Sequence, residues 1–151
     1  MTEHSIQFRA AAVVVHEGFV LLHQRAGDAF WALPGGRIER GEDARSALVR
    51  EMNEELSAPI DCGELLYVVE NFFNHGGQPH HEIGLYFLAQ FNAATPLLDK
   101  SKCHRGVEGL KRLDFQWFAP DELPALDLRP AFLRGVISQP VLAFQHLVQR
   151  C

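Results

Sequence analysis

Three acidic side chains, Glu51, Glu54 and Glu55, are spaced so that they could bind one cation together. The residues from Asp43 to Leu56 have helical periodicity, and on a helix that turns about 100° per residue the three carboxylates fall within an arc of about 100°. Like charges one turn apart repel each other, and the helix dipole disfavours negative charge in the second half of a helix. A solvated acidic face would leave both penalties in place, whereas a hard divalent cation such as Mg²⁺ or Mn²⁺ would relieve them.

The residues around these acids extend the candidate site. Gly36, directly after Gly35, allows the backbone to approach a metal or a ligand closely. Ala47 lies one turn before Glu51, and its small side chain is expected to leave room for a metal and a phosphate. Arg50 is expected to point away from the acidic arc and to orient a neighbouring acid rather than hold substrate. Glu42 is expected to cap the first turn of the helix by accepting backbone N–H bonds.

Alternating and apolar patterns predict the elements that must position this helix. Strands are expected at 10–15, 19–23, 65–73, 82–91 and 113–118, with the Gly-rich stretch 34–36 and the helix 43–56 between the first two pairs. The residues 74–79 are expected to form a mobile loop, and a short helix is expected to begin at Pro120. From Pro130 onward the tail is amphipathic and is expected to be broken in two at Pro140. These elements predict an α/β (α+β) sandwich, a mixed β-sheet between helices, in one domain over residues 1–151.

Composition excludes several classes of protein. Of the 151 residues, 47% are hydrophobic and 22% are charged, which is typical of a globular domain with a real core. The formal net charge is -5 and the basic residues are scattered, so duplex nucleic acid is not an expected partner. No stretch approaches the roughly 20 apolar residues of a membrane span, and residues 1–9 lack an apolar export segment. A cytoplasmic protein is therefore expected, with its three cysteines as free thiols.

The stretch that contains the acidic helix resembles the Nudix box of the Nudix hydrolases. The family pattern is Gly-x5-Glu-x7-Arg-Glu-U-x-Glu-Glu-x-Gly-U, where U is apolar, and this chain has Gly36-x5-Glu42-x7-Arg50-Glu51-Met52-x-Glu54-Glu55-Leu56-Ser57-Ala58. The one departure is Ser57, which stands where the family has glycine. A serine in the left-handed conformation that ends such a helix would cost roughly 1–2 kcal/mol. The departure leaves every acidic position of the pattern intact.

The resemblance implies an enzyme that hydrolyses a nucleoside diphosphate linked to another group, with Mg²⁺, or Mn²⁺, as cofactor. By the family's pattern the metal would be held by Glu51, Glu54 and Glu55 beside Gly36. Glu54 and Glu51 would take part in catalysis, with Arg50 as an orienting residue. Members often recruit a further glutamate from outside the box as ligand or base. Here Glu108, expected in a loop over residues 104–109, is the first candidate and Glu82 is the second.

The sequence leaves the substrate open. Small size and the lack of an extra domain favour a MutT-like nucleoside triphosphate pyrophosphohydrolase, and the alternative is an ADP-ribose or nucleotide-sugar pyrophosphatase. Candidate substrate-binding residues are Arg25, Trp31 and Glu82, although an aromatic side chain on a strand more often belongs to the core. Two readings of another class also stand: a noncatalytic module that senses a nucleotide, and an acidic helix that binds a protein. A homodimer is compatible with the exposed strands and the amphipathic tail.

Overall fold

A mixed β-sheet organises the molecule. The computed structural model describes residues 5–137 and 142–150. Its strands are β1 (Ile6–His16), β2 (Phe19–Arg25), β3 (Gly35–Arg37), β4 (Ile60–His75), β5 (Gln78–Phe91), β6 (His104–Glu108), β7 (Lys111–Phe118) and β8 (Gln145–Arg150). Their order in the sheet is β6-β7-β2-β1-β5-β4-β8, and β3 pairs with β1. The β1–β5 and β4–β8 pairs are parallel and the others are antiparallel.

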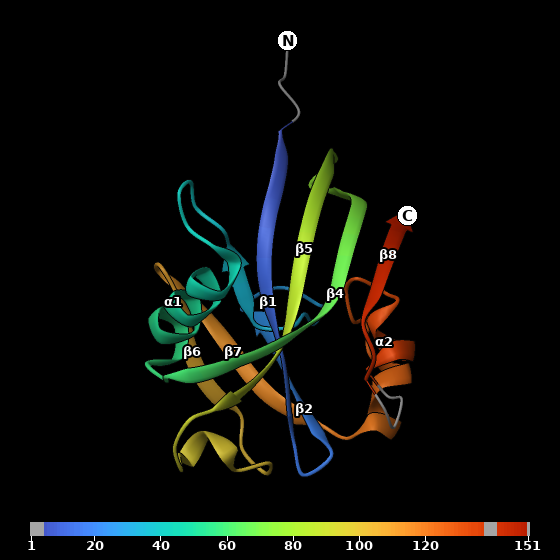
Figure 1. The fold of residues 1–151 in the computed structure, drawn as a ribbon. Helices are drawn as coiled ribbons and strands as arrows, with labels where there is room; N and C mark the ends of the chain where they lie inside the picture. Colours follow the sequence, from blue (N-terminus) through green and yellow to red (C-terminus); the bar gives the residue numbers. More distant parts are fainter. Residues whose placement is uncertain (1–4, 138–141, 151) are drawn as a thin grey trace.

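Helices cover both faces of the sheet. They are α1 (Ala44–Leu56) and α2 (Leu133–Val136), with 3₁₀ turns η1 (Pro96–Leu98) and η2 (Pro120–Ala125). In Figure 1, α1 and α2 lie on opposite sides of β1, β5 and β4. The central strand β1 is buried on both faces: Ala10, Ala12 and Val14 belong to the core under α1, and Ala11 and Val13 belong to the core that contains Leu133. The predicted mixed sheet between helices is confirmed.

Strands β1 and β2 separate soon after their turn, and β3 lies beside β1 farther along. The β1–β2 register is limited to two residue pairs at the turn, whereas β3 pairs with β1 at Arg9, Ala10 and Ala11. Gly35 has φ +150°, and a Cβ there would lie 2.0 Å from the Ala10 carbonyl oxygen. Only glycine fits this close approach of two backbones. The β3 strand therefore brings the chain into α1 directly beside the centre of the sheet.

Several predicted boundaries differ from the structure. The expected mobile loop 74–79 is wrong, because β4 continues to His75 and β5 starts at Gln78, with a two-glycine turn between them. Glu108 does not lie in a loop but ends β6, which forms a hairpin with β7. The tail ends in the strand β8, which pairs with β4, and Pro140 lies outside the described residues. No helix in the described part of the chain is long and apolar enough to span a membrane.

The two ends of α1 are capped by side-chain and backbone conformation. Asp43 is the N-cap, and its side chain accepts a hydrogen bond from the Ser46 backbone N–H at 2.8 Å. The prediction that Glu42 caps the helix is therefore wrong, since the residue one position later does so. At the other end Ser57 has φ 53° and ψ 35°, and its N–H donates to the Asn53 carbonyl oxygen. The left-handed turn expected at the missing box glycine is confirmed.

Candidate active site

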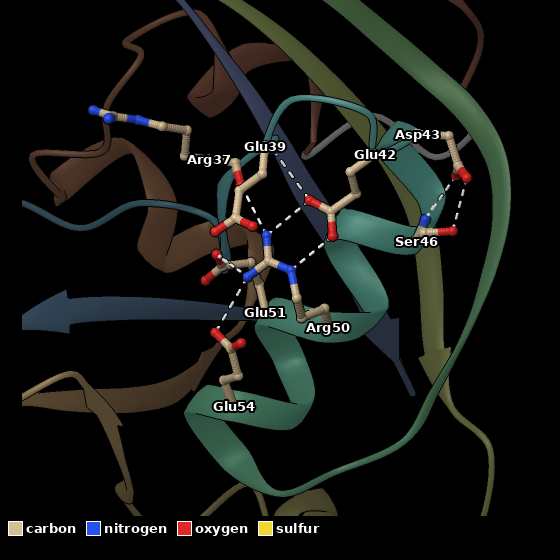
Figure 2. Close-up of polar contacts among 8 residues, drawn as sticks. All are labelled: Arg37, Glu39, Glu42, Asp43, Ser46, Arg50, Glu51 and Glu54. Carbon is tan, nitrogen blue, oxygen red and sulfur yellow. Dashed lines mark hydrogen bonds and ion pairs between the residues drawn. The ribbon is translucent and has the colours of Figure 1, made fainter.

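Arg50 is the centre of an ion-pair network on α1 (Figure 2). Its Nε and Nη2 donate to the two Glu42 carboxylate oxygens at 2.7 and 2.9 Å. Its Nη1 donates to Glu51 at 2.9 Å and to Glu54 at 3.3 Å, and Nη2 also reaches the Arg37 carbonyl oxygen at 3.1 Å. The expectation that Arg50 points away from the acidic arc is wrong, because the guanidinium folds back over Glu51 and Glu54. It touches the neighbouring acids directly, as an orienting residue must.

The charged groups in this network shift one another's pKa values. The hydrogen bond to Glu42, and then that to Glu51, raises the pKa of Arg50 above its usual range. The same contact with Arg50 lowers the pKa of the Glu42 carboxyl. Burial raises the pKa of Glu51 in spite of its hydrogen bond from Arg50. The Arg50 guanidinium thus links a half-buried carboxylate just before α1 to a partly desolvated one in its middle.

Glu55 is the deepest of the three acids. Its side chain is 4% exposed, and its Oε2 atom is buried without a hydrogen-bond partner among the described residues. Burial, opposed by Arg9 and reinforced by Glu51, raises the pKa of Glu55 to about 8. An unpaired carboxylate at this depth is costly unless a positive charge joins it. The donor set and the orphaned oxygen therefore fit a hard divalent cation.

Gly36 leaves space that the Glu51 carboxylate occupies. A Cβ at position 36 would lie 2.3 Å from Glu51 Cδ, so any side chain there would displace the carboxylate. Ala47, in contrast, is fully buried in the core under α1. The expectation that Ala47 leaves room for a metal and a phosphate is therefore wrong: its small side chain serves close packing of α1 on the sheet. The residue that lets the backbone lie close to the Glu51 carboxylate is Gly36, which has no side chain.

A cavity of about 1040 Å³ opens beside α1, a size typical of small-molecule sites. It is lined by most of the residues singled out from the sequence, namely Gly36, Glu51, Glu54, Arg25, Glu82 and Glu108. Glu55 and Arg50 are not in its wall, since Glu55 lies deeper and Arg50 lies on the Glu42 side of the acids.

Trp31 does not line this cavity. Its ring packs edge-on against Phe118 with centroids 4.9 Å apart, and it borders the core cluster that contains Leu133. The assignment of Trp31 to substrate binding is therefore corrected to a packing role. The preceding residue, Phe30, does line the cavity, and the Arg129 guanidinium lies 4.5 Å above its ring centroid.

Arg25 and Glu108 both line the cavity and form an ion pair with each other. Arg25 Nη2 donates to Glu108 Oε1 at 2.7 Å, from β2 and from the end of β6. The hydrogen bond that Arg25 donates to Glu108 raises the pKa of Arg25, and the Glu108 charge also contributes to the raised pKa of Glu55. Glu108 thus interacts electrostatically with the box acid Glu55, while Glu82 lines the same cavity from β5.

Several other polar residues of the cavity were missed from the sequence, among them Arg9, His23 and Asn71. Arg9 Nη2 donates to the Leu33 carbonyl oxygen at 2.8 Å. Burial and the charges of Arg9 and Arg25 lower the pKa of His23 to about 3, so its ring is neutral. The available signal was a polar residue within or directly beside an apolar strand.

The arrangement of the acids in this structure is not a closed metal cage. Among residues 5–137 and 142–150, no group of three or more His, Cys, Asp or Glu side chains is arranged to hold a metal ion as it stands. In Figure 2, Arg50 donates to one carboxylate oxygen of Glu51 and to one of Glu54.

Comparison with known proteins is consistent with the geometry of this site. The model of the NUDIX domain matches residues 7–139, which include every acidic residue discussed above. The chain belongs to the NUDIX family. As a Nudix hydrolase it is an enzyme that cleaves phosphoric anhydride bonds, and the acidic helix α1 carries its Nudix box.

Named relatives support this membership. The chain is 40% identical over 125 residues to a protein of Escherichia coli (strain K12) named CTP pyrophosphohydrolase, with 80% of this chain and 82% of the relative covered. It is 28% identical over 160 residues to an RNA pyrophosphohydrolase of Erythrobacter litoralis, covering 95% and 94%. The crystal structure of a MutT NUDIX hydrolase from Burkholderia pseudomallei superposes with a TM-score of 0.70 at 27% identity, covering 91% of this chain and 100% of that one.

Proposed function

We propose that this Nudix hydrolase converts nucleoside triphosphates to nucleoside monophosphate and pyrophosphate with Mg²⁺, or Mn²⁺, as cofactor. The observation that carries the proposal is the buried, unpartnered Glu55 oxygen, which lies on one helix face with Glu51 and Glu54. Two of these three acids open into a cavity of about 1040 Å³. The site therefore combines clustered hard oxygen donors with room for a small anionic substrate.

Each acid has its own part in the proposed reaction. Glu51, Glu54 and Glu55 would hold the cation beside the backbone of Gly36. The bound cation supplies neutralisation of phosphate charge and a lowered pKa for an attacking water. Glu108, paired with Arg25 at 2.7 Å, would take a proton from that water. Arg50 acts as a positioning residue that keeps Glu51 and Glu54 on the cavity side of α1.

Positive charge in the cavity supports an anionic substrate. Arg9 and Arg25 line it from β1 and β2, and Arg37 lines it from β3. Guanidinium groups recognise phosphate oxygens through paired, charge-assisted hydrogen bonds. Relatives named as pyrophosphohydrolases of CTP and of RNA agree with a substrate that carries a chain of phosphates on a nucleoside.

The test is a substrate panel with Mg²⁺ in which products are identified by mass. Purified protein is incubated with nucleoside triphosphates, oxidised nucleotides, ADP-ribose, nucleotide sugars and dinucleoside polyphosphates. Monophosphate plus pyrophosphate from a triphosphate is the expected result. Two monophosphate fragments from ADP-ribose or a nucleotide sugar alone would replace the proposal by the linked-diphosphate alternative, and saturable binding without turnover would replace it by a nucleotide sensor.

Two variants make the panel specific to the proposed acids. Glu54→Gln should lower turnover by orders of magnitude while the protein stays folded, because it removes one carboxylate charge and keeps the shape of the side chain. Glu64→Gln is the matched control, since Glu64 is exposed on β4 and does not line the cavity. Turnover of Glu54→Gln within about threefold of the wild type would refute the metal-binding role.

A further inference from the structure

A row of polar side chains crosses the sheet at the end of the cavity opposite to β3. Gln7 of β1 pairs with Glu82 of β5, Glu82 pairs with Asn71 of β4, and Asn71 pairs with Gln149 of β8. These four residues stand side by side on neighbouring strands, which Figure 1 shows running next to one another. All four line the same cavity, and we call them the polar row.

The polar row holds hydrogen-bonding capacity that the protein itself does not use. Asn71 is 8% exposed and lines the cavity, yet among the described residues its side chain makes no hydrogen bond. The Glu82 carboxylate and the Gln7 amide likewise have no hydrogen-bond or ion-pair partner in the described part of the chain. In the described part of the chain the Asn71 amide atoms are not among the buried polar atoms without a partner, so they are open to the cavity and to a ligand in it. Such a group at a cavity wall is typical of a site that a ligand completes.

The fourth member of the row is already engaged. The Gln149 Oε1 accepts a hydrogen bond from the Phe132 N–H at 3.3 Å, and its Nε2 donates to the Arg150 carbonyl oxygen at 3.2 Å. Gln149 therefore forms a fixed edge of the row, and Gln7, Glu82 and Asn71 remain for a ligand.

The polar row is separated from the phosphate-binding end by the length of a nucleoside. Gly36, beside the Glu51 carboxylate, pairs with Ala10 of β1, and Gln7 lies three residues earlier on the same strand, or about 10 Å away at the rise of a β-strand. Arg9 lies between them on the same strand and lines the cavity. A substrate with its phosphates near Glu51 and Arg9 would therefore place its base, and not its phosphates, at the row.

The chemistry of the row selects among bases. A carboxylate such as that of Glu82 accepts hydrogen bonds, whereas the amides of Asn71 and Gln7 can both donate and accept. A base with an exocyclic amino group can donate an N–H to the carboxylate. The neighbouring ring nitrogen or oxygen of such a base can accept a hydrogen bond from an amide N–H. Uracil offers one N–H between two carbonyl oxygens, and these oxygens would face the carboxylate unfavourably.

Resting on the proposed function, we propose that the polar row reads the base of the substrate, and that Glu82 favours nucleotides whose base carries an exocyclic amino group over their oxo counterparts. Glu82 is thus a specificity-determining residue rather than a ligand of the metal. It lies at the base end of the cavity, and the unpaired amides of Asn71 and Gln7 complete the recognition surface.

The experiment compares matched pairs of substrates that differ by one group. Values of kcat/KM are measured for CTP against UTP and for ATP against ITP, with wild type, Glu82→Gln and the exposed control Glu64→Gln. The wild type should prefer the amino member by at least about tenfold in the pair it hydrolyses faster. Glu82→Gln should bring that ratio close to one, with the loss in KM rather than kcat, and Glu64→Gln should keep the wild-type ratio.

A binding measurement separates this inference from the proposed function. Titration calorimetry with CMP and UMP, and with AMP and IMP, tests base selectivity without any hydrolysis. Triphosphate hydrolysis without amino preference, or a preference that Glu82→Gln retains, overturns the inference and leaves the proposed function standing. Amino-selective binding that Glu82→Gln abolishes, in a protein that hydrolyses no triphosphate, supports the base site and refutes the proposed function. Absence of both selectivity and hydrolysis refutes both.

Discussion

Replacing Glu55 by glutamine should stabilise the metal-free protein while it abolishes activity. The Glu55 carboxyl is 4% exposed with one oxygen unpaired, and its pKa is about 8 in the folded protein against an ordinary value of 4.5. The folded state therefore holds a proton that the unfolded chain has released, so stability falls as pH rises from 4.5 to 8. At pH 7 this costs roughly 3 kcal/mol of unfolding free energy. Glutamine carries no charge and should recover most of it.

The assay is thermal and urea unfolding in a metal chelator between pH 5 and 8, with Glu64→Gln as the control. A gain of roughly 3 kcal/mol corresponds to a rise in Tm of about 6–12 °C for a chain of this size, and the gain should grow with pH. Added Mg²⁺ should raise the Tm of the wild type and leave that of Glu55→Gln almost unchanged, because the variant lacks one ligand. A chelated Glu55→Gln protein that is less stable than the wild type at pH 7, or an equal response of both to Mg²⁺, would refute the reasoning.

Three further perturbations follow from the backbone and burial of single residues. Ser57→Gly should raise the unfolding free energy by about 1 kcal/mol, because Ser57 has φ 53° and glycine removes the left-handed strain at some entropic cost. Urea unfolding measures this change, and a clear loss of stability would contradict the prediction. Gly36→Ala should lower kcat at least about tenfold with little change in Tm. Its Cβ would lie 2.3 Å from Glu51 Cδ and would displace the end of that flexible side chain. An unchanged kcat would argue against the position given to Glu51. The pKa of His23 is lowered from 6.5 to about 3, so its ring stays neutral in the folded protein while it gains a proton in the unfolded chain as pH falls below 6.5. The unfolding free energy should therefore fall by about 2 kcal/mol between about pH 7 and 5. His23→Gln should remove this part of the pH dependence of the unfolding free energy, and an identical pH dependence in both proteins would refute it.

The fold could be predicted from sequence where its signal is local. Helix α1 was placed within one residue at its start, because Leu48, Met52 and Leu56 repeat with helical period. The parallel pairing of β1 with β5 joins residues far apart in the chain, and no pattern within either strand specifies it. Strand β6 was missed because it is short and contains Gly106. That glycine is needed where β6 passes α1, since a Cβ there would lie 2.5 Å from the Glu55 carbonyl oxygen.

The candidate site was predictable only where it lies on one helix. The spacing of the box acids fixes their common face on α1, but the direction of Arg50 depends on the Glu42 carboxylate, which lies before the helix begins. Which residues line the cavity depends on the direction in which each side chain points, and the sequence does not specify that direction. Phe30 and Trp31 are neighbours of similar chemistry, and only the packing of Trp31 on Phe118 decides which of them lines the cavity.

The distribution of charge along the cavity makes catalysis and base selection separable. The acids of α1, with Arg9 and Arg25, concentrate charge at one end, where phosphates and a cation would bind. The polar row at the other end carries one carboxylate among neutral amides, which suits hydrogen bonds to a base more than contacts to phosphate. Changes at the acidic end should therefore alter kcat for every nucleotide alike, whereas changes at Glu82 or Asn71 should alter the ratio between nucleotides. A variant of Glu82 that lowered kcat equally for CTP and UTP would place this carboxylate with the acids of α1 instead.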